Sequence, residues 1–281
     1  MSSHHFSIEF FPPKTPEACE KLRQTRARLY PLSPEYFSVT LGAGGSTQDG
    51  TQDVALQIHQ EGQRAAPHVT CIGTSRQTIR EKIMEYKSLG IRHLVALRGD
   101  LPNPYGELGE FHYANELVEF VRAETGDWFY IDVAAYPEMH PEAKSPQEDL
   151  INFVRKVRAG ADAAITQYFY NPDAYFRFVE NVRKEGVDIP VIAGIMPITN
   201  YTSLARFSDT CGAEIPRWIR LKLESYGDDL DSLRDFGLDV VTRLCEQLLA
   251  GGAPGFHFYS LNQAGPVEAL CERLRTVGYR V

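Results

Sequence analysis

Three residues with chemically useful side chains stand at or near the ends of short apolar runs in this chain. They are Glu9, Asp100 and Gln167. A carboxyl group in apolar surroundings can act as a general acid, and a carboxamide can both donate and accept hydrogen bonds along the edge of a heterocyclic ring. Because buried parallel strands read as continuous apolar runs, these residues are predicted at strand ends, where the strands of one sheet can bring them together.

Glu9 lies inside the apolar and aromatic run Phe6–Phe11. Burying a carboxylate is costly unless it is paired or stays neutral, so two interpretations are open. One is a buried salt bridge to an interior Arg or Lys. The other is a carboxylic acid whose pKa is raised by desolvation and which serves as a general acid.

Asp100 and Gln167 each have a functional and a structural interpretation. Asp100 follows Arg98 by two residues and precedes the Pro-containing segment 101–104, so it is either a site carboxylate or a local Arg partner or turn cap. Gln167 offers a donor and acceptors without charge, which suits a heterocyclic amide edge. A buried amide satisfied by its own protein is the alternative.

Eight apolar runs supply the elements that must position these residues. Residues near the run ends, Glu9, Thr40, Cys71, Asp100, Ala134, Gln167, Met196 and Tyr259, follow one another at steps of 31, 31, 29, 34, 33, 29 and 63 residues. A strand followed by a helix needs roughly 30 residues, so the last step must hold additional helix. The pattern predicts an α/β fold, a (β/α)8 TIM barrel forming a single domain over residues 1–281, with ligands bound at the carboxyl ends of the strands.

Helical spacing and helix boundaries fill the gaps between the runs. Ser75, Ser145 and Asn171 are expected N-caps, the last two followed by proline, and Gly90 and Gly160 are expected stops. The segment Leu230–Leu249 predicts a long helix that accounts for most of the last step.

Composition excludes several classes of partner. The chain has 281 residues and a net charge of −8, and it has no long Lys/Arg cluster, which argues against nucleic acid. With neither a membrane-spanning run nor a signal peptide, a cytoplasmic protein with no membrane partner is expected. The five cysteines are widely spaced and are expected to be structural thiols, and no group of residues has metal-ligand spacing, so no metal is predicted. The glycine-rich segment 42–47 is a weak phosphate motif, since it lacks the third glycine of a dinucleotide fingerprint and the lysine of a P-loop.

Seven segments, in order, resemble those of methylenetetrahydrofolate reductases, and the resemblance spans Phe6 to about Leu274. They are Glu9–Lys14, Ser38–Ser46, Pro67–Cys71, Leu97–Asp100, Ala134–Lys144, Ile165–Gln167 and Phe256–Asn262. The resemblance implies a barrel flavoprotein with non-covalent FAD. It further implies that 5,10-methylenetetrahydrofolate is reduced to 5-methyltetrahydrofolate with NADH or NADPH in a ping-pong sequence, supplying methyl groups for methionine synthesis.

The resemblance also assigns roles to residues. It makes Glu9 the general acid that assists opening of the folate five-membered ring, and Asp100 the anion near the flavin and pterin that stabilises the resulting iminium cation. FAD binding is implied for Thr40, His68, Arg98, Gly99, Asp100, Tyr113, Ala114, Tyr136, His140, Ala143, Asp149, Asn152 and Lys156, with Arg98 and Lys156 offsetting the pyrophosphate. Substrate binding is implied for Glu9, Asp100, Gln167, Ser203, Phe207, Tyr259 and Gln263, with Gln167 on the pterin edge and Phe207 stacking on the bound partner.

Two departures and three alternatives accompany the resemblance. Ser203 and Gln263 replace a Gln and a basic residue of bacterial relatives, so we expect the folate tail to be held more weakly or by another basic residue. The electron donor is a nicotinamide, with NADH favoured over NADPH, or a ferredoxin-type protein. The third alternative is a non-catalytic folate- or flavin-binding subunit, which the presence of both Glu9 and Asp100 disfavours. A homodimer or homotetramer is expected, without an additional regulatory domain or control by S-adenosylmethionine.

Overall fold

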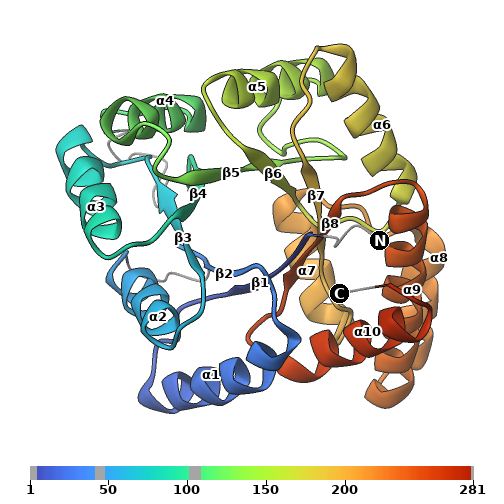
Figure 1. Ribbon diagram of the computed structural model, residues 1–281. Helices are drawn as coiled ribbons and strands as arrows, with labels where there is room; N and C mark the ends of the chain where they lie inside the picture. The colour runs from blue at the N-terminus through green and yellow to red at the C-terminus, as the bar shows by residue number, and fades with distance from the viewer. Residues whose placement is uncertain (1–4, 42–47, 101–108, 280–281) are drawn as a thin grey trace.

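Eight parallel strands form a closed barrel with helices around it (Figure 1). The computed structural model describes residues 5–41, 48–100 and 109–279. The strands are β1 (His5–Phe10), β2 (Tyr36–Val39), β3 (Ala65–Thr70), β4 (His93–Leu97), β5 (Tyr130–Ala135), β6 (Ala163–Thr166), β7 (Val191–Ile195) and β8 (Gly255–Tyr259). Each strand pairs with its neighbours in sequence, and β8 pairs with β1, which closes the barrel. The predicted TIM barrel is confirmed.

The helices alternate with the strands. They are α1 (Pro16–Leu29), α2 (Gln48–Gln60), α3 (Arg76–Ser88), α4 (Ala114–Thr125), α5 (Pro146–Arg158), α6 (Pro172–Lys184), α7 (Tyr201–Cys211), α8 (Arg217–Tyr226), α9 (Leu230–Ala250) and α10 (Ala264–Thr276), with a short 3-10 turn at Tyr30–Leu32. Ser75, Ser145 and Asn171 cap α3, α5 and α6 with their side chains, as predicted. The capping residue accepts a backbone N–H that the first helical turn leaves unpaired.

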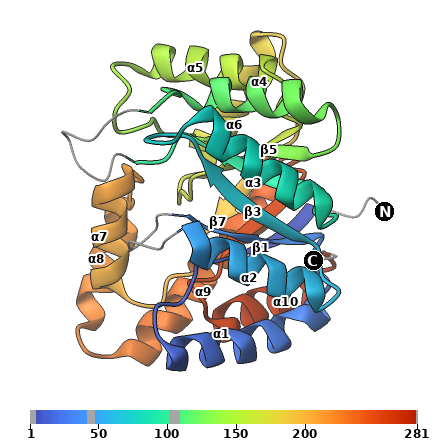
Figure 2. The ribbon, with the colours of Figure 1, turned by 90° about the vertical axis from the view of Figure 1, so that its left-hand side faces the viewer.

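The long step before β8 holds more helix than the sequence predicted. The long helix at Leu230 is confirmed as α9, but α7 and α8 precede it, and α8 was not predicted. Figure 2 shows α7 and α8 together at one side of the barrel. Because α7 follows the carboxyl end of β7, this extra helical layer stands beside the strand ends where barrel sites form.

Alternation along the strands divides the interior into an outer apolar shell and a lumen. On β1, Phe6, Ile8 and Phe10 are buried in the shell between strands and helices, while Ser7 and Glu9 alternate with them. Lumen positions of barrels usually hold bulky apolar side chains. Here the apolar lumen cluster of buried residues is small and consists of Tyr36, Ala66, Val95 and Ile165, which leaves room for polar groups.

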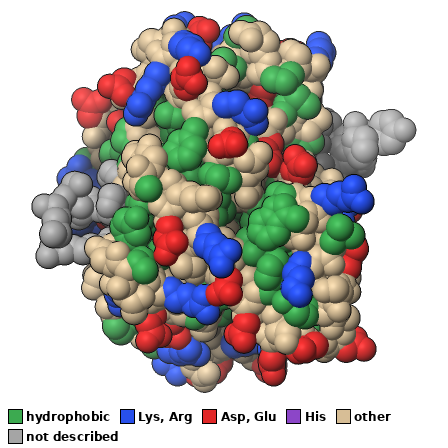
Figure 3. Space-filling model, turned by 90° about the vertical axis from the view of Figure 1, so that its right-hand side faces the viewer, with side chains coloured by type: hydrophobic (Ala, Val, Ile, Leu, Met, Phe, Trp, Pro, Cys, Tyr) green, Lys and Arg blue, Asp and Glu red, His purple; other side chains and the backbone are tan. Residues whose placement is uncertain are grey.

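One predicted strand has different bounds, and two predicted segments lie outside the described residues. The third strand was expected at His68–Ile72 but runs over Ala65–Thr70, because Pro67 is accommodated within it. The glycine-rich segment 42–47 and the Pro-containing segment 101–104 lie outside the described residues. Figure 3 shows acidic, basic and apolar side chains intermixed on the face that it presents.

Candidate active site

Glu9 lies at the carboxyl end of β1 between two histidines. Its Oε2 is 3.3 Å from His257 Nε2 and 3.4 Å from His68 Nε2, and the Glu9 side chain is 15% exposed. Its backbone carbonyl accepts a hydrogen bond from the Ser260 hydroxyl. A buried salt bridge from Glu9 to an Arg or Lys was one of the two interpretations of the sequence, and it is wrong. Strands β3 and β8 supply imidazoles instead.

The environment of Glu9 sets its ionisation. Burial by itself raises the pKa of this carboxyl, but hydrogen bonds to His257 and His68, together with their charge, lower the pKa from 4.5 to about 2. One of the two interpretations of the sequence was a carboxylic acid whose pKa is raised by desolvation. The net direction is the opposite, because two imidazoles stabilise the anion. A Glu9 that acts as an acid must therefore receive its proton from its neighbours.

Serine side chains hold His257 in place. His257 is completely buried, its Nδ1 is 2.7 Å from Ser7 Oγ and its Nε2 is 3.4 Å from Ser38 Oγ. The sequence analysis did not identify Ser7, Ser38 or His257. Period-two alternation could have found two of them: Ser7 is two residues before Glu9, and His257 is two residues before Tyr259, so both share the lumen face.

Asp100 is exposed just after β4. It lies close enough to Arg98 and Tyr136 to raise the pKa of both by charge, although hydrogen bonding to Glu142 is the larger cause for Arg98 and burial is the larger cause for Tyr136. One interpretation of the sequence paired Asp100 with Arg98, and the structure does not show that pair. Its guanidinium binds the Glu142 carboxylate in a bidentate pair, at 2.6 and 2.8 Å, which leaves Asp100 able to face a ligand.

Buried polar atoms at the ends of β2 and β3 have few partners. Thr40 Oγ1 has no hydrogen-bond partner among the described residues, and His68 Nε2 has there only its 3.4 Å contact with Glu9 Oε2. Unpaired buried polar atoms are rare, and a ligand that supplies their partners accounts for them. Gly99, with φ of +85°, lines the same region, and a Cβ there would lie 2.9 Å from Thr70 Cβ. These features fit the FAD contacts implied for Thr40, His68 and Gly99.

The segment between β5 and α5 forms a compact wall beside Arg98. The rings of Tyr136 and His140 contact edge to face at 4.5 Å, the His140 N–H donates to Asp149 at 2.8 Å, and the Ala143 N–H donates to the His140 carbonyl. Lys156 donates to the Ala134 carbonyl, and burial lowers the pKa of Lys156 from 10.5 to about 8. A cation held with so little compensation suits an anionic ligand.

Three further residues that the resemblance implied for FAD occupy the margin of this region. Tyr113 is the N-cap of α4 and is 60% exposed, and its carbonyl lies 3.7 Å from Cys71 Sγ, which places it and Ala114 beside the end of β3. Asn152 is exposed on α5, and its amide oxygen accepts from Arg155 at 3.0 Å. The structure therefore gives Asn152 a local partner.

Gln167 and Tyr259 lie at the carboxyl ends of β6 and β8. Gln167 Oε1 accepts from the Tyr168 N–H at 3.0 Å, and the Tyr259 hydroxyl donates to the Thr166 carbonyl at 2.7 Å. Gly194 provides the space for this arrangement, since a Cβ there would lie 2.0 Å from Thr166 O and 2.8 Å from Tyr259 Cε2. The Tyr259 ring is thereby fixed, and the Gln167 amide N–H₂ remains to donate.

Ser203, Phe207 and Gln263 lie on elements beside the strand ends. Ser203 and Phe207 are four residues apart on α7 and thus share one face of that helix. Phe207 is 37% exposed, with the Arg206 guanidinium 5.3 Å from its ring. Gln263 is exposed at the N-terminus of α10, where its side chain makes no capping bond, and it lines a cavity of about 380 Å³ that Arg234 of α9 also borders.

Two features are absent from the described part of the chain. No cluster of three or more His, Cys, Asp or Glu side chains is arranged to hold a metal ion there. None of the described helices combines the length and apolar character needed to cross a bilayer.

Comparison with known proteins gives one consistent family. A family model described as methylenetetrahydrofolate reductase matches residues 1–275. The chain is 42% identical over 269 residues to 5,10-methylenetetrahydrofolate reductase of Salmonella typhimurium, covering 95% of this chain and 90% of that protein. It is 40% identical to the Escherichia coli protein of the same name over the same share of each chain. It is also 37% identical to a maize methylenetetrahydrofolate reductase (NADH) 1, covering 92% of this chain and 46% of that protein.

A solved structure supports the fold independently. A Clostridium thermocellum protein described as binding two copies of 5-methyl-5,6,7,8-tetrahydrofolic acid superposes with a TM-score of 0.66 at 17% identity, covering 98% of this chain and 95% of that one. At that identity the likeness concerns the barrel alone.

Proposed function

The chain belongs to the methylenetetrahydrofolate reductase family, and on that premise we propose that it reduces 5,10-methylenetetrahydrofolate to 5-methyltetrahydrofolate with FAD and NADH. The observation that carries this proposal is the Glu9 carboxylate held by His257 and His68 at the carboxyl end of the barrel. Opening the folate ring needs a proton on its departing nitrogen, and a carboxyl group held between two imidazoles can deliver one.

FAD would lie along the ends of β2 to β5. Thr40, His68 and Gly99 would contact it, Lys156 would meet the pyrophosphate charge, and Tyr136, His140, Ala143 and Asp149 would form the wall beside it. Bound there, FAD supplies the hydride that reduces the folate. Arg98 would contribute positive charge that its Glu142 partner partly neutralises, so we assign the larger electrostatic role to Lys156.

The remaining residues would orient the folate. Gln167 would donate its amide N–H₂ to the pterin edge, Tyr259 would pack against the ring, and Phe207 would stack on whichever partner occupies the site. Asp100 would stabilise the positive charge that develops on the folate when its ring opens. Ser203 and Gln263 would lie along the aminobenzoyl-glutamate tail. Because donor and folate would occupy the same place in turn, the kinetics would be ping-pong.

The test is an anaerobic spectroscopic titration of the purified protein. A flavin spectrum that bleaches with NADH and recovers with methylenetetrahydrofolate would support cofactor, donor and both half-reactions together. A flavin that stays oxidised with NADH and NADPH but is reduced by a low-potential ferredoxin would replace the donor. A protein that binds no FAD would contradict the proposal.

A further inference from the structure

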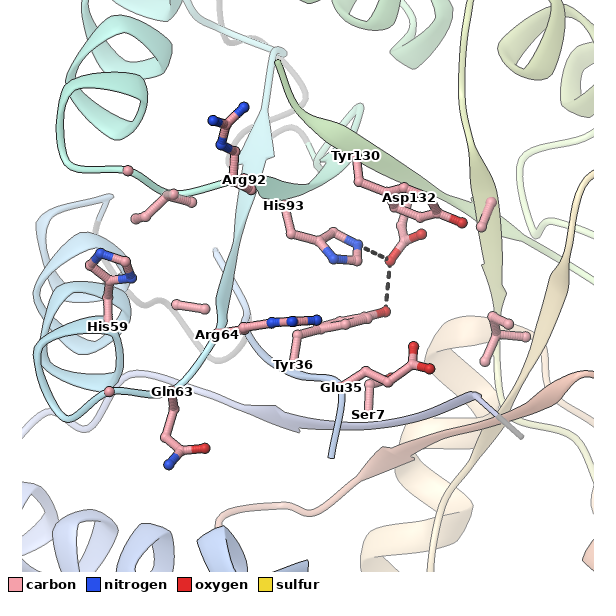
Figure 4. Close-up of a pocket in the computed structure, with 16 residues that line it drawn as sticks. Ser7, Glu35, Tyr36, His59, Gln63, Arg64, Arg92, His93, Tyr130 and Asp132 are labelled. Carbon is pink, nitrogen blue, oxygen red and sulfur yellow. Dashed lines mark hydrogen bonds and ion pairs between the residues drawn. The ribbon is translucent and has the colours of Figure 1, made fainter. Parts of the chain in front are cut away.

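A second polar cluster fills the amino-terminal end of the barrel lumen. The Tyr36 hydroxyl donates to Asp132 Oδ2 at 2.6 Å, and His93 Nε2 lies 2.8 Å from the same oxygen (Figure 4). Tyr36 and Asp132 are almost completely buried, and the Tyr36 and His93 rings are 4.0 Å apart. These groups come from the first residues of β2 and β4 and from β5, at the end of the barrel opposite to Glu9.

Ser7 joins this cluster to the Glu9 site. The strand register places Ser7 beside Tyr36 on one side and beside His257 on the other. Its hydroxyl is 2.7 Å from His257 Nδ1. Ser7 and Tyr36 also line the same cavity, and Ser7 lies close enough to the Tyr36 hydroxyl for donation from Ser7 to lower the pKa of Tyr36. A serine hydroxyl can donate once and accept twice, so one Ser7 can serve both partners. The result is a continuous run of polar groups: Glu9, His257, Ser7, Tyr36, Asp132 and His93.

The run ends at a cavity that opens at the amino-terminal end of the barrel. The cavity has a volume of about 640 Å³, and its lining includes Ser7, Tyr36, His93 and Asp132. Figure 4 shows the His93 imidazole and the Asp132 carboxylate side by side among the residues that line it. The His93 side chain is 16% exposed, so water or a small buffer molecule can reach it. The charged and titratable groups around this entrance are Glu35, His59, Arg64, Arg92 and Tyr130.

We propose that Glu9 receives its proton through this run, from solvent at the amino-terminal end of the barrel. The inference rests on the proposed function, in which Glu9 gives one proton to the folate in each turnover. With flavin and folate bound over the carboxyl end, water is excluded there. The lumen supplies a route from the other end that bound ligands do not cover.

Each transfer conserves protons. The Tyr36 hydroxyl first turns from Asp132 toward the Ser7 oxygen. His93 takes one proton from solvent at Nδ1 and passes the proton on Nε2 to Asp132; Asp132 passes one to the Tyr36 oxygen while the Tyr36 hydroxyl proton moves to Ser7. The Ser7 proton moves to His257 Nδ1, and the proton on His257 Nε2 moves to Glu9. The Ser7 and Tyr36 hydroxyls then rotate back, and the His93 and His257 rings flip so that each carries its proton on the original side. Every group is thereby back in its starting state, and one proton has moved from solvent to Glu9.

The pKa shifts of Tyr36 and Asp132 indicate that these groups pass a proton on and do not hold it. Burial, with the charge of Asp132 and a hydrogen bond to it, raises the pKa of Tyr36 well above 10, so Tyr36 stays neutral and can only pass a proton on. For Asp132, burial raises the pKa, but His93 and Tyr36 together lower it, so Asp132 does not retain the proton that it receives.

The first test is Tyr36→Phe, with Tyr175→Phe as the matched control. Tyr175 is also buried, and its hydroxyl donates to the Val191 carbonyl at 2.7 Å, outside the relay. In Tyr36→Phe we expect reoxidation of the reduced flavin by methylenetetrahydrofolate to slow about tenfold or more. Its solvent deuterium isotope effect should change, while reduction by NADH, which needs no proton on Glu9, stays as in the wild type. The control should leave both half-reactions unchanged.

The second test is His93→Ala with added imidazole, which the cavity can admit. Recovery of the folate half-reaction that follows the pKa across a series of substituted imidazoles would support proton entry at His93. Recovery independent of that pKa would reduce His93 to a space-filling role and overturn the proposal, as would an unchanged folate half-reaction in Tyr36→Phe. Absence of both half-reactions in the wild type would instead contradict the proposed function itself.

Discussion

His257 Nε2 lies 3.3 Å from Glu9 Oε2, a contact between side chains 248 residues apart in the sequence. It exists because β8 pairs with β1 and closes the barrel. Burial alone would raise the pKa of Glu9 and favour the neutral carboxyl. The contacts with His257 and His68 outweigh burial and lower the pKa to about 2. The ionisation of the proposed acid is thus decided by barrel closure.

The first prediction follows from that pKa. Because the folded pKa of Glu9 is below its ordinary 4.5, ionised Glu9 contributes stability above pH 4.5 that is lost as pH falls toward 2. The difference in free energy of unfolding between wild type and Glu9→Gln should therefore shrink by on the order of 3 kcal/mol across that range. Urea unfolding at several pH values measures it. Glu119→Gln, at an exposed position on α4, is the control; equal pH dependence in both variants would contradict the assignment.

Lys156 gives a prediction about cofactor binding. Burial lowers its pKa to about 8, so the free protein has lost much of this charge by pH 9, whereas a pyrophosphate beside it would keep it protonated. FAD binding at pH 8.5–9 should therefore take up a substantial fraction of a proton. Calorimetric titration in buffers of different ionisation enthalpy measures the uptake. Lys156→Met should abolish it and the nearby exposed Lys144→Met should not; uptake that persists in Lys156→Met would place the phosphate elsewhere.

The ion pair between Arg98 and Glu142 predicts that Glu142→Gln changes the affinity for FAD more than it changes the stability of the fold. The pair is partly exposed, with side chains 27% and 61% accessible, so Glu142→Gln should change unfolding free energy by less than about 1 kcal/mol. It should nevertheless tighten FAD binding severalfold, because Arg98 loses its neutralising partner. Fluorescence titration at two salt concentrations is the measurement, and the gain should decline at high salt. Weaker FAD binding in Glu142→Gln would mean that Glu142 positions Arg98.

Gly194 predicts a steric requirement behind Tyr259. A Cβ at Gly194 would lie 2.0 Å from the Thr166 carbonyl oxygen, so Gly194→Ala should displace β6 or Tyr259 and cost roughly 2–4 kcal/mol of stability. Folate binding should weaken with it. Gly265→Ala is the matched control, since no atom lies within 4 Å of its added Cβ and alanine favours the helix. Similar stability of the two variants would show that the barrel relaxes around residue 194.

Gln263 predicts how the folate tail is held. It is exposed and stands where bacterial relatives were expected to carry a basic residue. Gln263→Arg should lower the KM for methylenetetrahydrofolate, by a factor on the order of ten if the new ion pair forms, and leave the NADH half-reaction unchanged. An unaltered folate KM would mean that another cation already holds the tail. Arg234, which borders the same cavity as Gln263, is then the variant to make.

Local sequence determined most of the fold and the outline of the site. The spacing of eight apolar runs was enough for the barrel, because each strand and helix is specified within about 30 residues and parallel connections leave few topologies. Capping residues such as Ser145 and Asn171 act through neighbouring backbone groups, so they could be read directly. Chemistry at Glu9, Asp100 and Gln167 was likewise suggested by polar residues interrupting apolar runs.

Tertiary structure decided what those residues do. The state of Glu9 depends on His68 and His257, the partner of Arg98 is Glu142 rather than Asp100, and Ser7 connects two clusters that no local pattern relates. Each of these contacts joins separate strands or loops across the lumen or at its rim, and hydrogen bonds and charge act over a few ångströms of space rather than along the chain. The sequence therefore determined which groups reach the strand ends, and barrel closure determined their partners, their protonation and the route between the two ends.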